Sequence, residues 1–311
     1  MYYWIVLGII AIVVIEFLVR LPIIMGVVKV FEQSPGFGVE PAAPRDDGER
    51  ISFSSSDGLT IHGSLYSPPA PKGVFVFCPE TGGNHWMALN YIVALRDAGC
   101  AVVAFDFRNQ SDSDTMPGYE STHWPTEYEV NDGMAAVDFV TRHDELKSLP
   151  IGIFGVSRGG TVALTVAARH EKVQCVVGDG AFIINTLMQF FAVRWAELYV
   201  PRKWLAYLPG WHISSTLFFA RSISQYKRSV RYATLNSDLP RLRDKDVMLI
   251  AGKRDSYVKP EMTEEIARRA GGNAEIWIAP KAKHNMARTM NETEYDCRLV
   301  EFVEQSFGWS K

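Results

Sequence analysis

Residues 151–160 read IGIFGVSRGG, and the fold follows from this stretch. The apolar run at residues 151–154 predicts a short buried strand, and the Ala-, Val- and Leu-rich residues 159–170 predict a helix. Between them, Gly155-Val-Ser157-Arg-Gly159 matches the pattern G-x-S-x-G. A serine at such a strand-to-helix turn is held in a sharp, strained bend that exposes its hydroxyl at the edge of a sheet. The stretch therefore predicts Ser157 as a nucleophile.

The two glycines of this turn have a physical role. Gly155 and Gly159 carry no Cβ atom, so neighbouring elements can approach closely. The positive end of the following helix would stabilise negative charge that develops beside Ser157. The alternative interpretation is a glycine-containing turn of a structural or phosphate-binding kind.

Outward from this turn, apolar strands alternate with amphipathic helices. Asp57-Gly58 is typical of a hairpin turn and predicts antiparallel edge strands at the start of the domain. The remaining alternation predicts an α/β fold, with a mostly parallel sheet covered by helices on both faces. The expected strands are residues 51–54, 59–66, 73–78, 101–106, 151–154, 173–177, 246–251 and 274–279. The expected helices are residues 85–97, 127–142, 159–170, 260–270 and 292–307.

The alternation stops at residues 181–240, a segment rich in aromatic side chains. We expect a helical cap inserted over the carboxyl edge of the sheet. Such a cap would cover an apolar pocket, or its aromatic side chains would serve packing and membrane contact. The aromatic residues are Phe182, Phe190, Phe191, Trp195, Tyr199, Trp204, Tyr207, Trp211, Phe218 and Phe219.

A serine nucleophile needs a base, and the base needs a carboxylate that orients it. His284 follows the last expected strand, and Asp255 follows the strand before it. The order Ser157, Asp255, His284 is the chain order of this architecture, and both loops lie at carboxyl ends of strands. Asp179, directly after the strand that follows Ser157, is the rival acid.

The other histidines fit a catalytic role less well. They lie in an expected strand, at helix ends or in loops before helices, where ordinary structural roles suffice. His212 lies in the insertion and could line the pocket. These residues are His62, His85, His123, His143, His170 and His212.

Two backbone N–H groups should face the developing oxyanion. One comes from the residue after the nucleophile, Arg158, and the second from the loop after an earlier central strand. That loop reads CPETGGN at residues 78–84, where Thr81 is the expected donor and Gly82 the next choice. The alternative is a plain glycine turn.

The amino-terminal residues differ from the rest. Residues 1–31 contain three charges, Glu16, Arg20 and Lys29, and residues 2–19 form an apolar stretch. As a helix, these 18 residues would span about 27 Å, close to the thickness of a bilayer core. Glu16 and Arg20 are four residues apart and can pair on one face.

The segment predicts a membrane anchor at residues 1–31, a Pro- and Gly-containing linker at residues 32–50 and one large α/β domain at residues 51–311. The alternative is a cleaved signal peptide, but no Lys or Arg precedes the apolar stretch. Because Arg20 and Lys29 lie on its carboxyl side, we expect the domain to face the cytoplasm.

Composition excludes several classes. The chain is 47% hydrophobic, too apolar for a disordered protein. Its net charge of −3 gives no basic surplus for a nucleic acid. Cys78, Cys100, Cys175 and Cys297 have no metal-type spacing, and we expect neither a metal nor a cofactor. The oligomeric state is left open.

These residues together resemble the α/β-hydrolase superfamily over residues 51–309. Asp106-Phe-Arg-Asn109 is similar to the family's Asp-Tyr-Arg-Gly segment, with Asn109 at the position of the glycine. Pro79-Glu80 stands where many members have His-Gly. Among its branches, the chain looks like the membrane-anchored ABHD serine hydrolases and the related serine-aminopeptidase-like group.

The resemblance implies acyl chemistry on a small acyl or lipid-like substrate. The expected function is cleavage of an ester or thioester through Ser157, His284 and Asp255. An aminopeptidase or amidase on the same triad is the first alternative, with Glu80, Glu120 or Glu197 available to bind a substrate amine. A non-catalytic binding protein that kept the fold is the second.

Overall fold

The computed structural model describes residues 2–33, 39–198, 201–205, 207, 209–272 and 274–309. The chain divides into two compact units. Residues 35–184 and 231–311 form the sheet unit, and residues 1–34 and 185–230 form the helical unit. The predicted division into an anchor, a linker and a capped domain stays a prediction.

The sheet unit contains an eight-stranded sheet among its described residues, with the order β1-β2-β4-β3-β5-β6-β7-β8. The strands pair in parallel from β4 onward, while β1 and β2 form the antiparallel edge. The expected hairpin is confirmed, and Gly58 in its turn has φ 88°. The strands are β1 Glu49–Ser54, β2 Thr60–Tyr66, β3 Gly73–Cys78, β4 Cys100–Phe105, β5 Ile151–Val156, β6 Val173–Asp179, β7 Asp246–Gly252 and β8 Ala274–Ala279.

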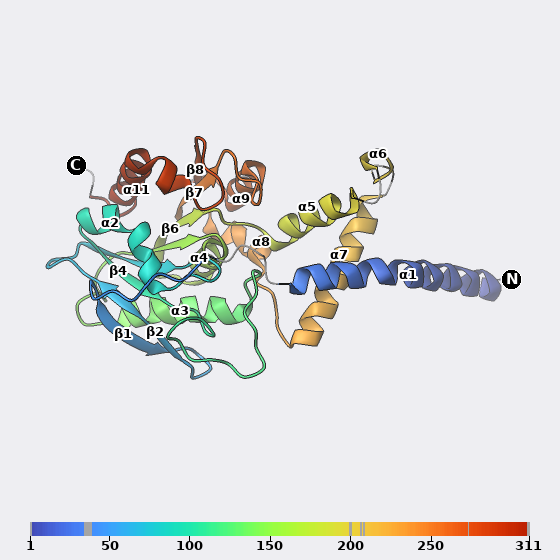
Figure 1. Cartoon of the computed structure of the whole chain (residues 1–311), viewed down its shortest axis with the longest axis horizontal. Coiled ribbons are helices and arrows are strands. Elements are labelled where there is room, and N and C mark those ends of the chain that lie inside the picture. Colours follow the sequence, from blue (N-terminus) through green and yellow to red (C-terminus); the bar gives the residue numbers. More distant parts are fainter. Residues whose placement is uncertain are drawn as a thin grey trace. The chain divides into compact units, whose positions relative to one another are not determined.

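Helices cover both faces of this sheet, as the alternation predicts (Figure 1). α3 and α4 pack together on one face, and α2 and α11 pack together on the other. The elements are η1 His85–Asn90, α2 Val93–Asp97, α3 Glu127–Arg142, α4 Arg158–Arg169, α8 Leu235–Asp238, η2 Leu239–Leu242, α9 Pro260–Ala270, α10 Ala287–Met290 and α11 Glu292–Ser306.

One expected helix is broken. Residues 85–97 form the 3₁₀ segment η1 and the short helix α2 rather than one helix. The break is at Tyr91, which has φ −127° and donates its N–H to Ala88 O in a tight i to i−3 bond. The Tyr91 ring is buried and stacks on Phe77 at 5.8 Å, so tertiary packing decides the backbone here.

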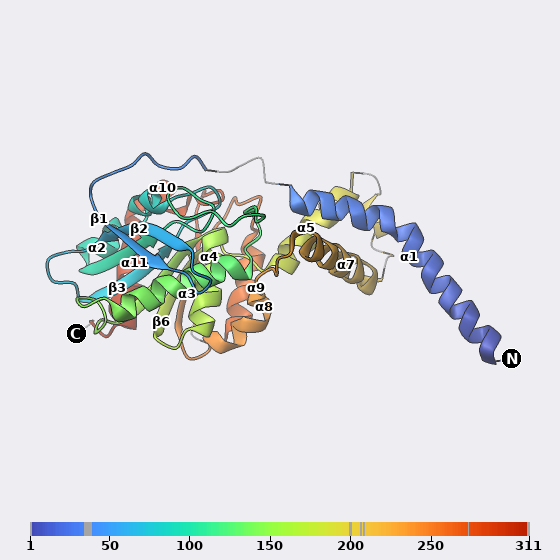
Figure 2. The ribbon, with the colours of Figure 1, turned by 90° about the horizontal axis from the view of Figure 1, so that it is seen from below.

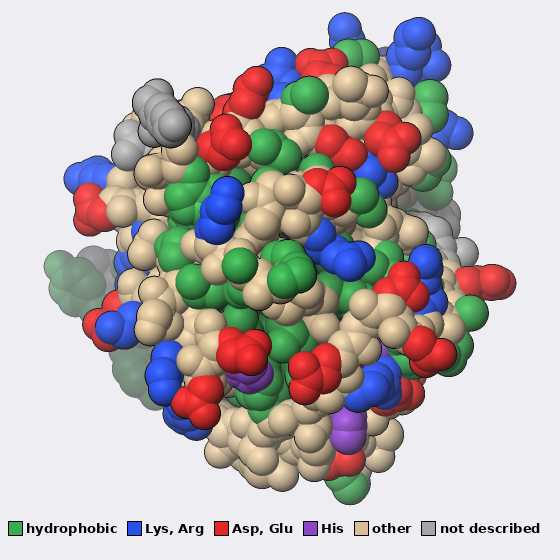
Figure 3. Space-filling model, turned by 90° about the vertical axis from the view of Figure 1, so that its left-hand side faces the viewer, with side chains coloured by type: hydrophobic (Ala, Val, Ile, Leu, Met, Phe, Trp, Pro, Cys, Tyr) green, Lys and Arg blue, Asp and Glu red, His purple; other side chains and the backbone are tan. Residues whose placement is uncertain are grey.

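The centre of the sheet is apolar on both faces. All residues of β3, β4 and β5 are buried, and Phe77 and Phe154 meet edge to face at 5.4 Å. This burial is the largest favourable term for a fold of this size. At the outer surface, acidic and basic side chains are interspersed on the face shown in Figure 3.

The helical unit consists of α1 Tyr2–Glu32, α5 Ile184–Ala196, α6 Arg202–Leu205 and α7 Gly210–Arg228. The helical nature of the aromatic segment is therefore confirmed for these residues. α1 continues through Pro22, which has no N–H to donate, and Figure 2 shows a bend along this helix. Within residues 2–29, an 18-residue window has a mean hydropathy of 2.6, so the helix is long and apolar enough to cross a membrane.

Candidate active site

Ser157 lies between the end of β5 and the start of α4. Its backbone has φ 53° and ψ −117°, a conformation that ordinary residues rarely adopt and that stores about 1–3 kcal/mol of strain. Backbone hydrogen bonds hold it on both sides, from Ser157 N to Asp179 O at 2.6 Å and from Thr161 N to Ser157 O at 3.1 Å. The expected sharp turn is therefore present at this serine.

The glycines around this turn are required by close backbone contacts. A Cβ atom on Gly155 would lie 2.1 Å from Gly159 O, and one on Gly159 would lie 2.2 Å from Cys78 O. Neither distance is tolerable for a carbon next to an oxygen. The strand, the helix and the loop after β3 thus meet backbone to backbone beside Ser157, as the motif predicts.

The structure brings the predicted acid and base to this serine. Ser157 Oγ and His284 Nε2 are 2.8 Å apart, and His284 Nδ1 and Asp255 Oδ2 are 2.6 Å apart. Asp255 is buried, and its Oδ1 accepts hydrogen bonds from Tyr257 N at 2.7 Å and Val258 N at 2.9 Å. The carboxylate is thereby fixed, and an Nδ1–H on His284 leaves Nε2 free to accept the serine proton.

The rival acid has a different partner. The Asp179 carboxyl is buried and accepts a hydrogen bond from the Tyr295 hydroxyl at 3.1 Å. Burial raises the pKa of Asp179 to about 7. Its contact with Ser157 is through the backbone carbonyl, whereas the carboxylate on the His284 ring is that of Asp255.

The predicted oxyanion donors lie in the two expected segments. Arg158 is the first residue of α4, directly after Ser157. Thr81 is partly buried, with its hydroxyl 3.3 Å from His123 Nδ1, and Gly82 has φ 79°. The assignment of their N–H groups to an oxyanion stays a prediction.

Glu80 stands where many members of the resembled family have the glycine of His-Gly. Its side chain is buried in the protein. It is 2% exposed, and its Oε1 accepts a hydrogen bond from the Tyr91 hydroxyl at 3.2 Å. Burial raises the pKa of the Glu80 carboxyl above its ordinary value. A buried carboxyl of this kind is poorly placed to receive a substrate amine.

One aromatic residue beside His284, Tyr257, was missed by the sequence argument. The Tyr257 ring lies 5.0 Å from the His284 ring and 5.0 Å from the His123 ring, and the Tyr257 hydroxyl contacts His123 Nε2. Burial lowers the pKa of His123 to about 3, so this imidazole is neutral. The proximity of Tyr257 to Asp255 in the sequence is the one signal that pointed to it.

A buried ion pair supports the turn from behind. Arg158 and Glu129 are both 0% exposed at their side chains, and their Nη2 and Oε1 atoms are 2.5 Å apart. Glu129 Oε2 also accepts from Thr126 N and Thr126 Oγ1, each at 2.7 Å, closing a capping box at the start of α3. The nucleophile turn is therefore tied to α3 by a charge pair that no local pattern predicts.

A second buried arginine, Arg108, also pairs with an acidic residue of α3. Arg108 bonds Asp132 on α3, with Nη2 and Oδ1 2.7 Å apart, and also reaches Asp57 in the β1–β2 turn. The neighbouring Asn109 has φ 61°, which explains why it can replace a glycine. Its Oδ1 accepts from Met116 N at 2.7 Å, so the side chain stabilises the left-handed turn.

One cluster has metal-type residues. Ligand atoms of His85, Asp106 and Asp112 lie within 4.8 Å of one another. Arg50 already supplies positive charge there, because its Nη1 is 2.6 Å from His85 Nε2 and its Nη2 contacts Asp112. Asp106 accepts hydrogen bonds from His85 N and lies 2.9 Å from His85 Nδ1. The cluster is thus a closed ion-pair network.

Comparisons with known proteins agree with the fold. Residues 61–294 match the model of the alpha/beta hydrolase family. The uncharacterized protein YqkD of Bacillus subtilis is 25% identical over 253 residues, which are 80% of this chain and 77% of that protein. Thiohydrolase aneE of Aspergillus aculeatus is 26% identical over 128 residues, 41% of this chain and 39% of its own. The structure of the Pyrococcus furiosus esterase Pf2001 superimposes with a TM-score of 0.62 at 21% identity, covering 88% of this chain and 99% of the esterase.

Proposed function

The chain belongs to the alpha/beta hydrolase family, and on this premise we propose that it is a membrane-anchored serine hydrolase that cleaves an ester or a thioester. The observation that carries the proposal is the hydrogen-bonded series of Ser157, His284 and Asp255, with distances of 2.8 Å and 2.6 Å. The esterase and thiohydrolase among its relatives support a carbonyl bonded to oxygen or sulfur.

In the proposed reaction, Ser157 Oγ attacks the substrate carbonyl while His284 Nε2 takes its proton. His284 then gives this proton to the leaving alcohol or thiol, and an acyl-enzyme remains. Asp255 holds the His284 tautomer and stabilises the imidazolium. N–H groups of Arg158 and of Thr81 or Gly82 bind the oxyanion. Water releases the acyl group by the same proton route in reverse.

An acyl or lipid-like substrate fits the anchor. The span of α1 would hold the domain beside a bilayer, where substrates with long acyl chains are concentrated. We further propose that the sheet unit faces the cytoplasm, because Arg20 and Lys29 follow the apolar stretch. Protease protection in sealed vesicles tests this orientation.

Labelling with a fluorophosphonate probe tests the chemistry. The full chain in detergent micelles should be labelled, Ser157→Ala should not, and Ser148→Ala, an exposed loop serine, should label like the wild type. Before labelling, the wild type should hydrolyse p-nitrophenyl esters or acyl thioesters with an optimum chain length, and labelling should abolish this activity. Labelling that survives Ser157→Ala contradicts the proposal. Turnover of aminoacyl anilides alone would favour an aminopeptidase, and neither labelling nor turnover would favour a binding protein.

A further inference from the structure

The two halves of α1 face different surroundings. All residues from 2 to 15 are exposed, including Trp4, Ile9 and Ile12 at 75%, 56% and 69%. From there on, one face is buried, at Arg20, Ile24, Val28 and Phe31. The spacing of four, four and three residues is that of one helix face. The first half thus has no protein surface against it in the described part of the chain, and the second half packs against a neighbouring element.

The partner of this face is α7, within the same helical unit. Ile24 and Val28 of α1 form an apolar cluster with Ala220, and Phe17 packs edge to face on Phe219 at 5.2 Å. Residues later in α1 contact residues later in α7, so the two helices run in the same direction. The α7 helix is therefore aligned along the second half of α1.

A polar cluster fixes α7 at the point where the exposed half of α1 ends. Arg20 pairs with Glu16 at 3.1 Å and donates to Ser215 Oγ at 2.6 Å and to His212 O at 3.3 Å. His212 Nε2 lies 2.8 Å from Glu16 Oε1. The expected Glu16–Arg20 pair is thus present, and its second role is to bind the first turns of α7.

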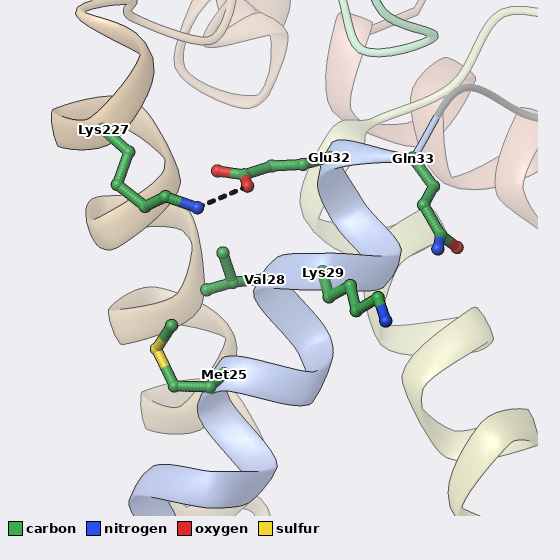
Figure 4. Close-up of a pocket in the computed structure, with 6 residues that line it drawn as sticks. All are labelled: Met25, Val28, Lys29, Glu32, Gln33 and Lys227. Carbon is green, nitrogen blue, oxygen red and sulfur yellow. Dashed lines mark hydrogen bonds and ion pairs between the residues drawn. The ribbon is translucent and has the colours of Figure 1, made fainter.

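At the other end of the contact between α1 and α7, the Lys227 Nζ and Glu32 Oε2 atoms form an ion pair at 2.7 Å (Figure 4). Beside them is an open pocket of about 280 Å³, lined by Met25, Val28, Lys29, Glu32, Gln33 and Lys227. The size of this pocket and the lysines that line it do not indicate a particular ligand. The α1–α7 contact is thus held by hydrogen bonds of Arg20 at one end and by the Lys227–Glu32 ion pair at the other.

Large aromatic side chains are exposed at the start of α7 and in the segment just before it. Trp211, next to His212, is 60% exposed, and Trp204 and Tyr207 in the preceding segment are 62% and 83% exposed. We call Trp204, Tyr207 and Trp211 the aromatic collar. Trp and Tyr concentrate where a bilayer meets water, because their rings are apolar and their N–H and O–H groups remain hydrated.

The charge of the helical unit also favours contact with a membrane surface. Its sequence contains eight Lys and Arg and three Asp and Glu, a net charge of +5, whereas the whole chain has −3. The sheet unit therefore carries −8. A basic segment beside an apolar span is attracted to anionic lipid headgroups.

We propose that the aromatic collar binds the headgroup region of an anionic bilayer, at the depth where α1 leaves the hydrocarbon. This inference rests on the membrane anchoring in the proposed function. It assigns residues 2–19 to the hydrocarbon and makes the inserted segment a second membrane contact. The α1–α7 contact sets the depth of the collar, so anchor and insertion act as one lipid-binding element.

Fluorescence of the full chain in vesicles tests the proposal. One NBD label is placed at a time, on the exposed native Cys297 or, in a Cys297→Ser background, on Gly8→Cys or Tyr207→Cys. The vesicles contain phosphatidylcholine with 30% phosphatidylserine and lipids with a shallow or a deep doxyl quencher. We expect position 8 to be quenched by the deep probe, position 207 at least twofold by the shallow probe, and position 297 by neither.

The outcomes separate the two claims. If position 207 behaves like position 297 while position 8 is quenched, the collar proposal is wrong and the anchor stands. If position 8 is also unquenched, the anchor fails, while fluorophosphonate labelling still decides the hydrolase chemistry. A blue-shifted but unquenched label at position 207 would mean that a second copy of the chain covers the collar, which overturns the proposal. Equal quenching in pure phosphatidylcholine overturns the preference for anionic lipid.

Discussion

The sheet unit buries most of its large apolar side chains, whereas the helical unit leaves many of them exposed. Beside Ser157 in the sheet unit, the charged side chains of Arg158 and Glu129 are 0% exposed. In the helical unit, Trp4 and Trp211 are 75% and 60% exposed, while the Arg20 side chain is 7% exposed against its neighbour helix. The first pattern holds polar groups in fixed geometry inside an apolar core, and the second is suited to an apolar solvent outside.

The two units should therefore respond differently to single substitutions. In the sheet unit, a buried charge that loses its partner cannot be rescued by water, so single substitutions there should have large effects. In the helical unit, the exposed apolar residues make few protein contacts, and its ion pairs are partly solvated. The predictions below test this difference, from the largest expected effect to the smallest.

Asp255→Asn should lower kcat on a p-nitrophenyl ester by about 10⁴-fold, because the amide favours the wrong His284 tautomer. Asp179→Asn is the matched control, since its carboxyl bonds Tyr295 and not the base. We expect it to keep kcat within about threefold, in line with the small effects of groups that make no transition-state contact. Equal losses in the two variants would mean that the acid has been assigned to the wrong residue.

Arg158→Met should reduce the free energy of unfolding by about 3–5 kcal/mol, because it leaves the Glu129 charge buried without a cation. The double variant with Glu129→Gln should recover part of this loss. Lys147→Met breaks an exposed pair with Asp144 and should change stability by about 1 kcal/mol or less. Urea unfolding in detergent measures all three. Similar effects of Arg158→Met and Lys147→Met would remove the contrast between buried and solvated charge.

The buried Asp179 should make stability depend on pH. Burial raises its pKa from 3.8 to about 7, so the folded state keeps a proton that the unfolded state releases. Stability from this group is therefore complete below pH 4 and is lost as pH rises through 7. Relative to Asp179→Asn, the wild type should lose about 4 kcal/mol between pH 4 and 8. A constant difference between their unfolding free energies over this range would contradict the shifted pKa.

The smallest effect is expected at the edge of the helical unit. Lys227→Met removes the ion pair with Glu32, whose side chains are 49% and 21% exposed, and should cost about 1 kcal/mol or less. Arg20→Met should cost more, since it also removes hydrogen bonds to His212 O and Ser215 Oγ. Thermal unfolding in micelles compares them. A larger effect at Lys227 would show that the far end, not the polar cluster, holds α7.

Local patterns predict most of the fold. Residues 73–78, 127–142, 260–270 and 274–279 begin and end as expected, because hydrophobic period and turn residues act over short distances. The loops of Asp255 and His284 could be chosen from chain order alone, and these side chains lie in hydrogen-bond contact with one another and with Ser157. Their catalytic roles stay predictions.

What the sequence does not predict depends on distant contacts. The Arg158–Glu129 pair joins residues 29 positions apart on different elements, and nothing in either local pattern marks it. The break at Tyr91 follows from its stacking on Phe77. The apolar nature of α1 and the aromatic content of the insertion are plain in the sequence, but the contact of α1 with α7 required coordinates.

The α1–α7 contact also has a consequence for biosynthesis. Arg20 and its acceptor on His212 are 192 residues apart, so α1 is made long before its partner. At about 5–20 residues per second, the interval is roughly 10–40 s. During that time the Glu16–Arg20 face has no α7 against it, while the strands up to β6 are already available to pair. The contact between anchor and insertion can therefore form only after the strands up to β6 have been made, and chains that end before residue 210 never complete it.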